Sequence, residues 1–310
     1  MSPTPARDAV APSGDQIEIA FEDQRAVVVE VGGGIRTYSA NGHDVLDGYG
    51  VEELCPSGRG QLLVPWPNRI QDGSYEFDGK RHQLPLTEPG LGNAIHGLAR
   101  WASWQVRKRE SDRALLEHLI RPQPGYPFTL ALRVEYTLAE DGLSVRTAAT
   151  NIGKDPCPYG AGAHPYLAVG TATVDGLELQ APARRVLLHD ERDLPVGYEP
   201  VEGTEFDFRA ARPIGGTILD NAFTDLERDP AGRAHVGLTD PATGRKVTLW
   251  VDEHYPYLML FTGDPLPDVN RRALAVEPMT CPPNAFRTGD SLIRLDPGES
   301  AVGVWGIAVH

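Results

Sequence analysis

Two dipeptides in this chain place an acid/base side chain immediately before a proline, namely His164-Pro165 and Glu277-Pro278. A proline ring pushes the preceding residue out of the α region into extended geometry, so each candidate side chain stands on a stiff backbone. An imidazole and a carboxylate held in this way could face a sugar ring from two sides, as general acid/base catalysis requires. The alternative interpretation is that both dipeptides are ordinary strand ends.

A second set of candidates consists of polar residues embedded in aromatic and glycine-rich sequence. Sugars stack their C–H faces on indole rings, and their hydroxyls need directional partners such as Asn, Arg and Asp. The segments with this character contain Asn68, Arg69, His96, Arg100, Trp101 and Trp104. Core packing is the competing interpretation for both tryptophans, because indoles are more often buried than used as platforms. A buried Arg69 must find carboxylate or ligand oxygens.

Other motifs do not point to chemistry. The run Val31-Gly32-Gly33-Gly34 is followed by strand-like residues, so it predicts a glycine turn and not a dinucleotide site. The letters Gly289-Asp290-Ser291-Leu292 match an esterase signature, but they lack a strand-to-helix elbow and only His310 lies downstream. The nine histidines and three cysteines show no metal-ligand or disulfide spacing. We therefore expect no metal and no cofactor.

Composition narrows the partners. With 43 acidic and 29 basic residues the formal charge is −14, which disfavours a nucleic acid or an anionic membrane as partner. The expected ligand is a small neutral molecule, or an anion held by a local arginine. No window resembles a signal peptide or a membrane span, so we expect a cytoplasmic protein, either a monomer or a homodimer. Residues 1–14 are expected to be a disordered N-terminal arm, and residues 15–310 one domain.

The hydrophobic periodicity is mostly two, which predicts strands. It is clearest in residues 128–151, where two alternating runs flank Glu140-Asp141-Gly142 and indicate a long hairpin. Residues 75–80 predict a shorter hairpin whose Asp-Gly pair suits a tight primed turn. Further strands are expected at residues 17–21, 26–31, 247–251, 257–261, 273–276 and 302–309. The chain is therefore expected to be all-β, with large sheets packed face to face and few short helices.

At this point the order of the motifs resembles a known family. Asn68-Arg69-Ile70, residues 72–79, His96-Gly97, His164-Pro165-Tyr166, residues 219–223 and Glu277-Pro278 follow one another as in the aldose 1-epimerases, the galactose mutarotases. The resemblance covers the chain from about residue 15 to its end. It implies a large β-sandwich (a supersandwich) with an open groove across one sheet, and no cofactor. It also implies that Glu277 is the base, His164 the acid, His96 a partner near the ring oxygen, and Arg69, Asn68 and Asp220 ligands of sugar hydroxyls.

The substrate stays open. Leu167 to Gly170 and Met279-Thr280 depart from the usual continuations of the galactose-type enzymes and resemble a bacterial branch that includes sulfoquinovose mutarotases. A sulfonate would need a local cation, for which Arg100 is the candidate, with Trp101 beside it. A hexose-6-phosphate mutarotase is disfavoured because no dense arginine cluster is present. A non-catalytic carbohydrate-binding protein, and a glycosidase using Glu277 and Asp220, are the alternative classes.

Overall fold

The computed structural model describes residues 10–310. The first nine residues of the expected N-terminal arm lie outside the described part. The remainder of that segment turns at Ala11 to Gly14, where the Gly14 amide donates to the Ala11 carbonyl, and Ser13 is buried. Ser13 also accepts a backbone hydrogen bond from Val31, so this turn is attached to the sheet that follows.

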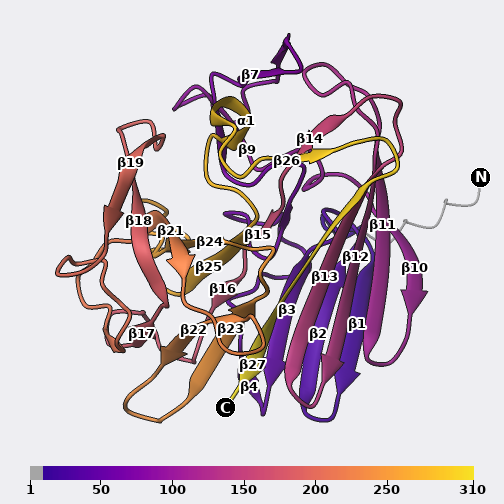
Figure 1. Cartoon of the computed structure of the whole chain (residues 1–310). Helices are drawn as coiled ribbons and strands as arrows, with labels where there is room; N and C mark the ends of the chain where they lie inside the picture. The colour runs from indigo at the N-terminus through magenta and orange to yellow at the C-terminus, as the bar shows by residue number, and fades with distance from the viewer. Residues whose placement is uncertain (1–9) are drawn as a thin grey trace, which may run out of the picture.

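Two large antiparallel sheets form the body of the molecule (Figure 1). The nine-stranded sheet has the order β10 (Gln105–Arg109), β11 (Arg113–Ile120), β12 (Leu130–Ala139), β13 (Gly142–Asn151), β27 (Ser300–Val309), β23 (Lys246–Val251), β22 (Ala234–Thr239), β17 (Glu178–Gln180) and β20 (Arg212–Pro213). The eight-stranded sheet has the order β19 (Pro195–Pro200), β18 (Ala183–His189), β21 (Asp220–Leu226), β24 (Tyr257–Phe261), β25 (Leu274–Met279), β15 (Gly162–Ala163) and β5 (Leu62–Leu63), with β16 (Tyr166–Leu167) also paired to β25.

Smaller sheets and ribbons pack around this body. A four-stranded sheet of β1 (Gln16–Phe21), β2 (Gln24–Val29), β3 (Ile35–Ala40) and β4 (His43–Asp44) packs its first strand against β11 and β12. Three two-stranded ribbons are β6 (Arg69–Gln71) with β9 (Asn93–Ile95), β7 (Ser74–Phe77) with β8 (Lys80–Gln83), and β14 (Cys157–Tyr159) with β26 (Ile293–Leu295). In residues 10–310 the single α-helix is α1 (Ala285–Thr288).

The expected all-β sandwich is confirmed, and the strand periodicity explains it. Along β12 the buried side chains Leu130, Leu132, Val134, Tyr136 and Leu138 alternate with more exposed ones, and all five belong to the main core. Leu258, Leu260 and Val276 of the other large sheet belong to the same core, so the inner faces of the two sheets meet there. The predicted primed turn is also present, because Asp78 and Gly79 both have positive φ, 49° and 71°.

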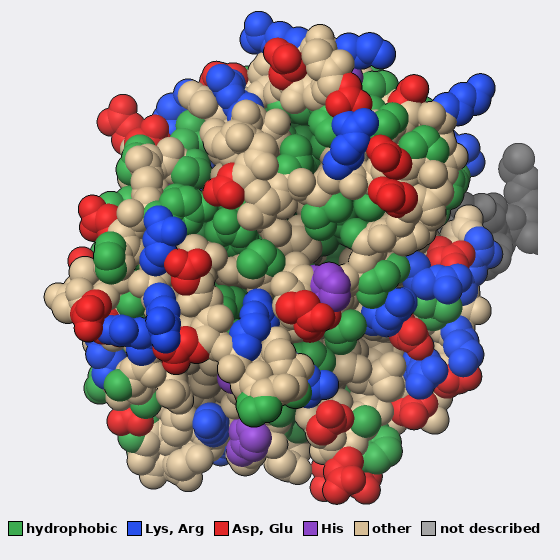
Figure 2. Space-filling view, viewed as in Figure 1, with side chains coloured by type: hydrophobic (Ala, Val, Ile, Leu, Met, Phe, Trp, Pro, Cys, Tyr) green, Lys and Arg blue, Asp and Glu red, His purple; other side chains and the backbone are tan. Residues whose placement is uncertain are grey.

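The surface carries charged side chains of both signs. On the face drawn in Figure 2 acidic and basic side chains are interspersed and form no extended basic stripe. Within residues 10–310 no helix is long and apolar enough to cross a membrane.

Candidate active site

Strands β24 and β25 carry one wall of the candidate site. Every residue of both strands is buried, although only one face of each can point into the main core. The register pairs Glu277 with Met259, and Met259 with Ala222 on β21, so these three side chains share the face opposite the core. Asp220 stands on the same face, paired with Phe261. The second face of the sheet is therefore the floor of a site.

His164 faces Glu277 because both flanking strands fix it there. Gly162 pairs with Met279 and Tyr166 pairs with Ala275, so the same register sets His164 opposite Glu277. The distance from His164 Nε2 to Glu277 Oε1 is 3.3 Å, and both side chains are almost fully buried. The two residues that precede prolines therefore sit on neighbouring extended segments, as the sequence predicts.

The opposite wall comes from the β6–β9 ribbon. Arg69 pairs with Ile95, and the amide of His96 donates to the carbonyl of Asn68 at 2.9 Å. Asn68 and His96 both have left-handed backbones, with φ of 53° and 61°. Such a conformation is uncommon for a residue other than glycine and concentrates at functional sites. It turns both side chains away from the ribbon and toward the pocket, where the His96 ring meets the His164 ring edge-on at 5.5 Å.

A pocket of about 300 Å³ lies between these walls, and all eight predicted site residues line it. They are Asn68, Arg69, His96, Arg100, Trp101, His164, Asp220 and Glu277. Of the two tryptophans, Trp104 is a core residue at 2% exposure, whereas Trp101 is 49% exposed at the pocket rim. The core interpretation therefore holds for Trp104 but not for Trp101.

Arg69 is paired with two carboxylates. Its Nε and Nη2 donate to the two carboxylate oxygens of Glu88 at 2.8 and 2.9 Å, and Nη2 also lies 3.0 Å from Asp193. Burial alone would lower the pKa of Arg69, but these two carboxylates outweigh it and raise that pKa. The carboxylates that a buried Arg69 requires thus come from two loops, and the planar guanidinium is fixed by a two-pronged pair.

Arg100 has the opposite environment. Its guanidinium stands over the Trp101 ring, 5.4 Å from the ring centroid, and within residues 10–310 it makes no hydrogen bond or ion pair. Burial lowers its pKa. The more distant charge of Glu88 opposes this shift, but no carboxylate contacts the guanidinium within residues 10–310. It is a pocket cation with free donors.

Burial shifts the protonation equilibria of both members of the central pair. Burial, supported by the positive charges of Arg100 and Arg59, lowers the pKa of His164 to about 3. Burial, supported by the negative charge of Asp220, raises the pKa of Glu277 well above its usual range, against the opposing effect of Arg69. Both shifts favour neutral side chains in the sugar-free site, because the lost solvation outweighs the charges that oppose it.

Several polar atoms at the centre of the site have no partner. Among the described residues, His96 Nδ1, His164 Nδ1 and Glu277 Oε2 are buried without a hydrogen bond. Buried polar groups in folded proteins are nearly always satisfied, so three unsatisfied atoms around one pocket mark a place where a polar ligand belongs. Over residues 10–310, no group of three or more His, Cys, Asp or Glu side chains is arranged to hold a metal ion.

Sequence reasoning did not identify several residues that contribute to the site. Glu88, Asp193 and Tyr166 line the pocket beside the predicted residues, as do Met259 and Phe261 on its floor. Tyr166 was inside the His-Pro-Tyr motif, so its proximity to His164 could have been inferred. Nothing in the local sequence of Glu88 or Asp193 signals the site, because these loop carboxylates reach Arg69 only through tertiary folding.

Comparisons with known proteins agree with this geometry. The chain matches the family model for aldose 1-epimerase over residues 15–305. It is 36% identical over 288 residues to the uncharacterized protein YihR of Escherichia coli K12, covering 93% of this chain and 91% of that protein. It is 30% identical over 218 residues to the aldose 1-epimerase of the same organism, covering 66% of this chain and 61% of that protein.

Solved structures show the same fold. A homologue of aldose epimerase from C. elegans superposes with a TM-score of 0.84 at 19% identity, covering 96% of this chain and 98% of that chain. A putative aldose 1-epimerase from Escherichia coli K12 gives a TM-score of 0.82 at 22% identity, with 96% and 99% covered.

Proposed function

Because the chain belongs to the aldose 1-epimerase family and is an isomerase, we propose that it interconverts the α- and β-anomers of a hexose, with Glu277 as base and His164 as acid. One observation carries the proposal: a buried carboxylate and a buried imidazole, 3.3 Å apart, face a sugar-sized pocket in which both retain unsatisfied atoms.

The reaction requires two coupled proton transfers. Glu277 removes the proton from the C1 hydroxyl while His164 donates one to the ring oxygen, so the C1–O5 bond breaks and an open-chain aldehyde forms. Rotation about C1–C2 and the reverse transfers close the ring on the other face of C1. Each positioned acid or base contributes roughly 10²- to 10⁴-fold. His96 lies beside His164 and is available to stabilise charge on the ring oxygen.

The neutral forms favoured by the sugar-free site are compatible with these roles. A protonated Glu277 with a neutral His164 holds as many protons as a carboxylate with an imidazolium, so the reactive state needs only a shift of one proton within the pair. A sugar hydroxyl that donates to Glu277 would favour its carboxylate form, as Arg69 already does. Binding of the substrate is therefore expected to set the acid and the base.

A sulfonated hexose such as sulfoquinovose is the second candidate substrate, and Arg100 is the observation that favours it. This guanidinium borders the pocket without any carboxylate partner among residues 10–310, in a chain whose formal charge is −14. A sulfonate carries three oxygens that share one negative charge, and the guanidinium of a free arginine can donate to two of them. Such a local cation is necessary because the net negative charge of the chain repels an anionic sugar at long range. A neutral hexose leaves the charge of Arg100 unused.

Polarimetry tests the proposal. Freshly dissolved α-glucose, α-galactose and α-sulfoquinovose are followed with and without the protein, and at least one should equilibrate faster with it. A Glu277→Gln variant of unchanged fold is the control and should lose the acceleration. Binding without acceleration would favour a carbohydrate-binding protein, and release of alcohol from a glycoside would favour a glycosidase that uses Glu277 and Asp220.

A further inference from the structure

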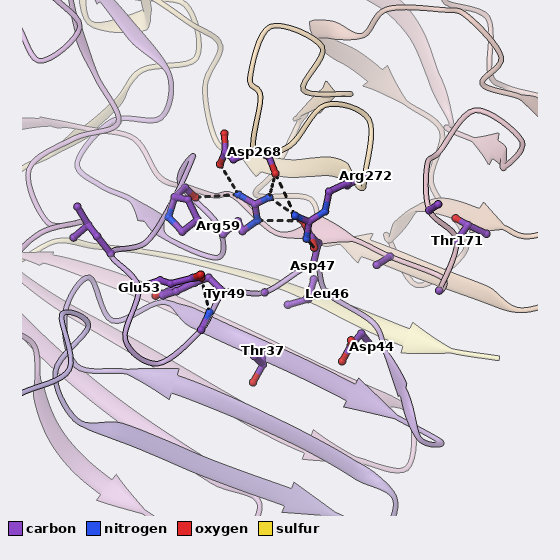
Figure 3. A pocket seen from close by; sticks show the side chains of 17 residues that line it. Thr37, Asp44, Leu46, Asp47, Tyr49, Glu53, Arg59, Thr171, Asp268 and Arg272 are labelled. Atoms are coloured by element: carbon purple, nitrogen blue, oxygen red, sulfur yellow. Dashed lines mark hydrogen bonds and ion pairs between the residues drawn. The ribbon is translucent and has the colours of Figure 1, made fainter.

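A cluster of charged side chains lies directly behind the candidate site. Arg59 is almost fully buried, with 3% of its side chain exposed, and lines an open hollow of about 870 Å³. Figure 3 shows its guanidinium between Asp47 and Asp268, with the Arg272 guanidinium beside it and also paired with Asp47. Arg59 Nη2 lies 2.9 Å from Asp47, and Nη1 lies 3.1 Å from Asp268. These two ion pairs fix the plane of the guanidinium.

The Tyr166 ring contacts both this guanidinium and the imidazole of His164. Arg59 Cζ lies 5.2 Å from the centre of the Tyr166 ring, and that ring is stacked on the His164 imidazole at 4.9 Å with an angle of 15°. The backbone around Arg59 also contacts His164: the Gly60 amide donates to the His164 carbonyl at 2.9 Å. A Cβ at Gly58 would approach the imidazole Cδ2 to 3.0 Å. One face of the imidazole is therefore covered by Tyr166, which contacts Arg59, and the neighbouring residue Gly58 lies close to the imidazole Cδ2.

Arg59 also holds the loop that forms another wall of the pocket. Residues 262–273 connect β24 to β25, and Pro265 and Leu266 of this loop line the pocket. Asp268 anchors the loop, since its carboxylate pairs with Arg59 and accepts from the Ser57 hydroxyl at 2.8 Å. The Asp268 carbonyl also accepts a hydrogen bond from Arg59, at 3.1 Å. Arg59 thus contacts both Tyr166, which stacks on His164, and the loop that forms the adjacent wall of the pocket.

We propose that Arg59 is a positioning residue for this reaction: through the Tyr166 ring it fixes the His164 imidazole, and through Asp268 it fixes the adjacent pocket loop. The inference rests on the proposed role of His164. Sugar hydroxyls would be bound by the opposite wall, which Arg59 does not contact. The contribution of Arg59 should therefore be found in kcat and not in the binding of the sugar.

The first experiment replaces Arg59 by glutamine and measures kcat and KM separately. Asp47 keeps Arg272 as a partner, so the substitution leaves no isolated buried charge there. We expect kcat to fall roughly 10- to 100-fold, the loss typical of a catalytic group displaced by about 1 Å, and KM to stay within about threefold. An unchanged kcat, or a loss confined to KM, would overturn the proposal.

Arg271 offers a matched control in the same loop. It is similarly buried, with 14% of its side chain exposed, and pairs with Asp175 and Asp264, but it makes no contact with Tyr166 or His164 in the described chain. Arg271→Gln loosens the same loop without touching Tyr166 or His164, so it should lower thermal stability and cost less kcat than Arg59→Gln. If Arg271→Gln lowers kcat as much as Arg59→Gln, the effect of Arg59 is only structural.

A double-mutant cycle with Tyr166→Leu tests the route through the ring. If Arg59 acts on the imidazole through Tyr166, the loss in the double variant should be smaller than the product of the two single losses, whereas independent effects would multiply. Multiplying effects overturn the proposal. Should Arg59→Gln not fold, Arg59→Lys keeps a cation beside Asp47 but has no planar fork, and it should show the same selective loss of kcat. Full kcat in Arg59→Lys would count against the proposal. Failure of the proposed function itself would be seen separately, as activity that survives His164→Asn.

Discussion

The two arginines that line the pocket have opposite surroundings. Arg69 is held by Glu88 and Asp193, whereas the guanidinium of Arg100 has no ion-pair partner among residues 10–310. The same contrast separates Arg59, whose guanidinium donates to four oxygens, from the Glu277–His164 pair, in which Glu277 Oε2 and His164 Nδ1 have no partner. Buried charges that find protein partners hold the architecture in place. Buried polar groups left without partners are the ones available to a substrate, at a cost in stability.

The largest effect is expected at the unsatisfied pair. Glu277→Gln removes the proton acceptor but keeps the side-chain shape, and His164→Asn removes the proton donor. Each should lower kcat by roughly two to four decades with the fold retained. Rates of mutarotation by polarimetry, with circular dichroism as the check on folding, measure this. Near-normal rates in either folded variant would rule out the assignment of the pair.

Arg69 should matter most for stability. Arg69→Met leaves the Glu88 and Asp193 carboxylates without their main partner, and breaking a largely buried pair costs about 3 kcal/mol. Arg107 is the matched control, since it also pairs with a glutamate, Glu117, but its side chain is 53% exposed. Arg107→Met should cost less than about 1 kcal/mol. Equal losses of unfolding free energy in urea for the two variants would show that burial does not increase the contribution of the Arg69 ion pairs to stability.

Arg100 should matter for one class of substrate. If the sugar is sulfonated, Arg100→Ala should weaken its binding by roughly 1.5 to 3 kcal/mol, the range for a hydrogen bond to a charged group. Turnover of glucose should stay nearly unchanged, because a neutral sugar offers no anion to pair. Titration calorimetry with sulfoquinovose and polarimetry with glucose separate the two. Equal losses for both sugars would indicate a general structural role for Arg100.

The sequence predicted which residues line the candidate pocket better than it predicted the ion pairs that support them. Strand periodicity and the residues before the two prolines are local signals, and the antiparallel register then brings His164 opposite Glu277. Ion-pair partners are set by tertiary folding, so neither Glu88 with Arg69 nor Asp268 with Arg59 could be read from neighbouring residues. Burial also dominates the pKa shifts of the pair, and burial is not visible in one sequence.

The smallest effects concern stability and pH, and here the two members of the pair should act in opposite directions. Folding raises the pKa of Glu277 above 4.5, so the stability contributed by this group is complete at low pH and is lost as the pH rises above 4.5 toward the raised value. Folding lowers the pKa of His164 from 6.5 to about 3, so its contribution is complete above 6.5 and is lost as the pH falls toward 3. Relative to the parent protein, Glu277→Gln should therefore gain unfolding free energy as the pH increases, and His164→Asn should gain it as the pH decreases, each by up to about 1.4 kcal/mol per pH unit within its window. Urea unfolding from pH 4 to pH 8 measures both slopes. Parallel curves for the two variants and the parent would show that the sugar-free site does not hold Glu277 and His164 in neutral form.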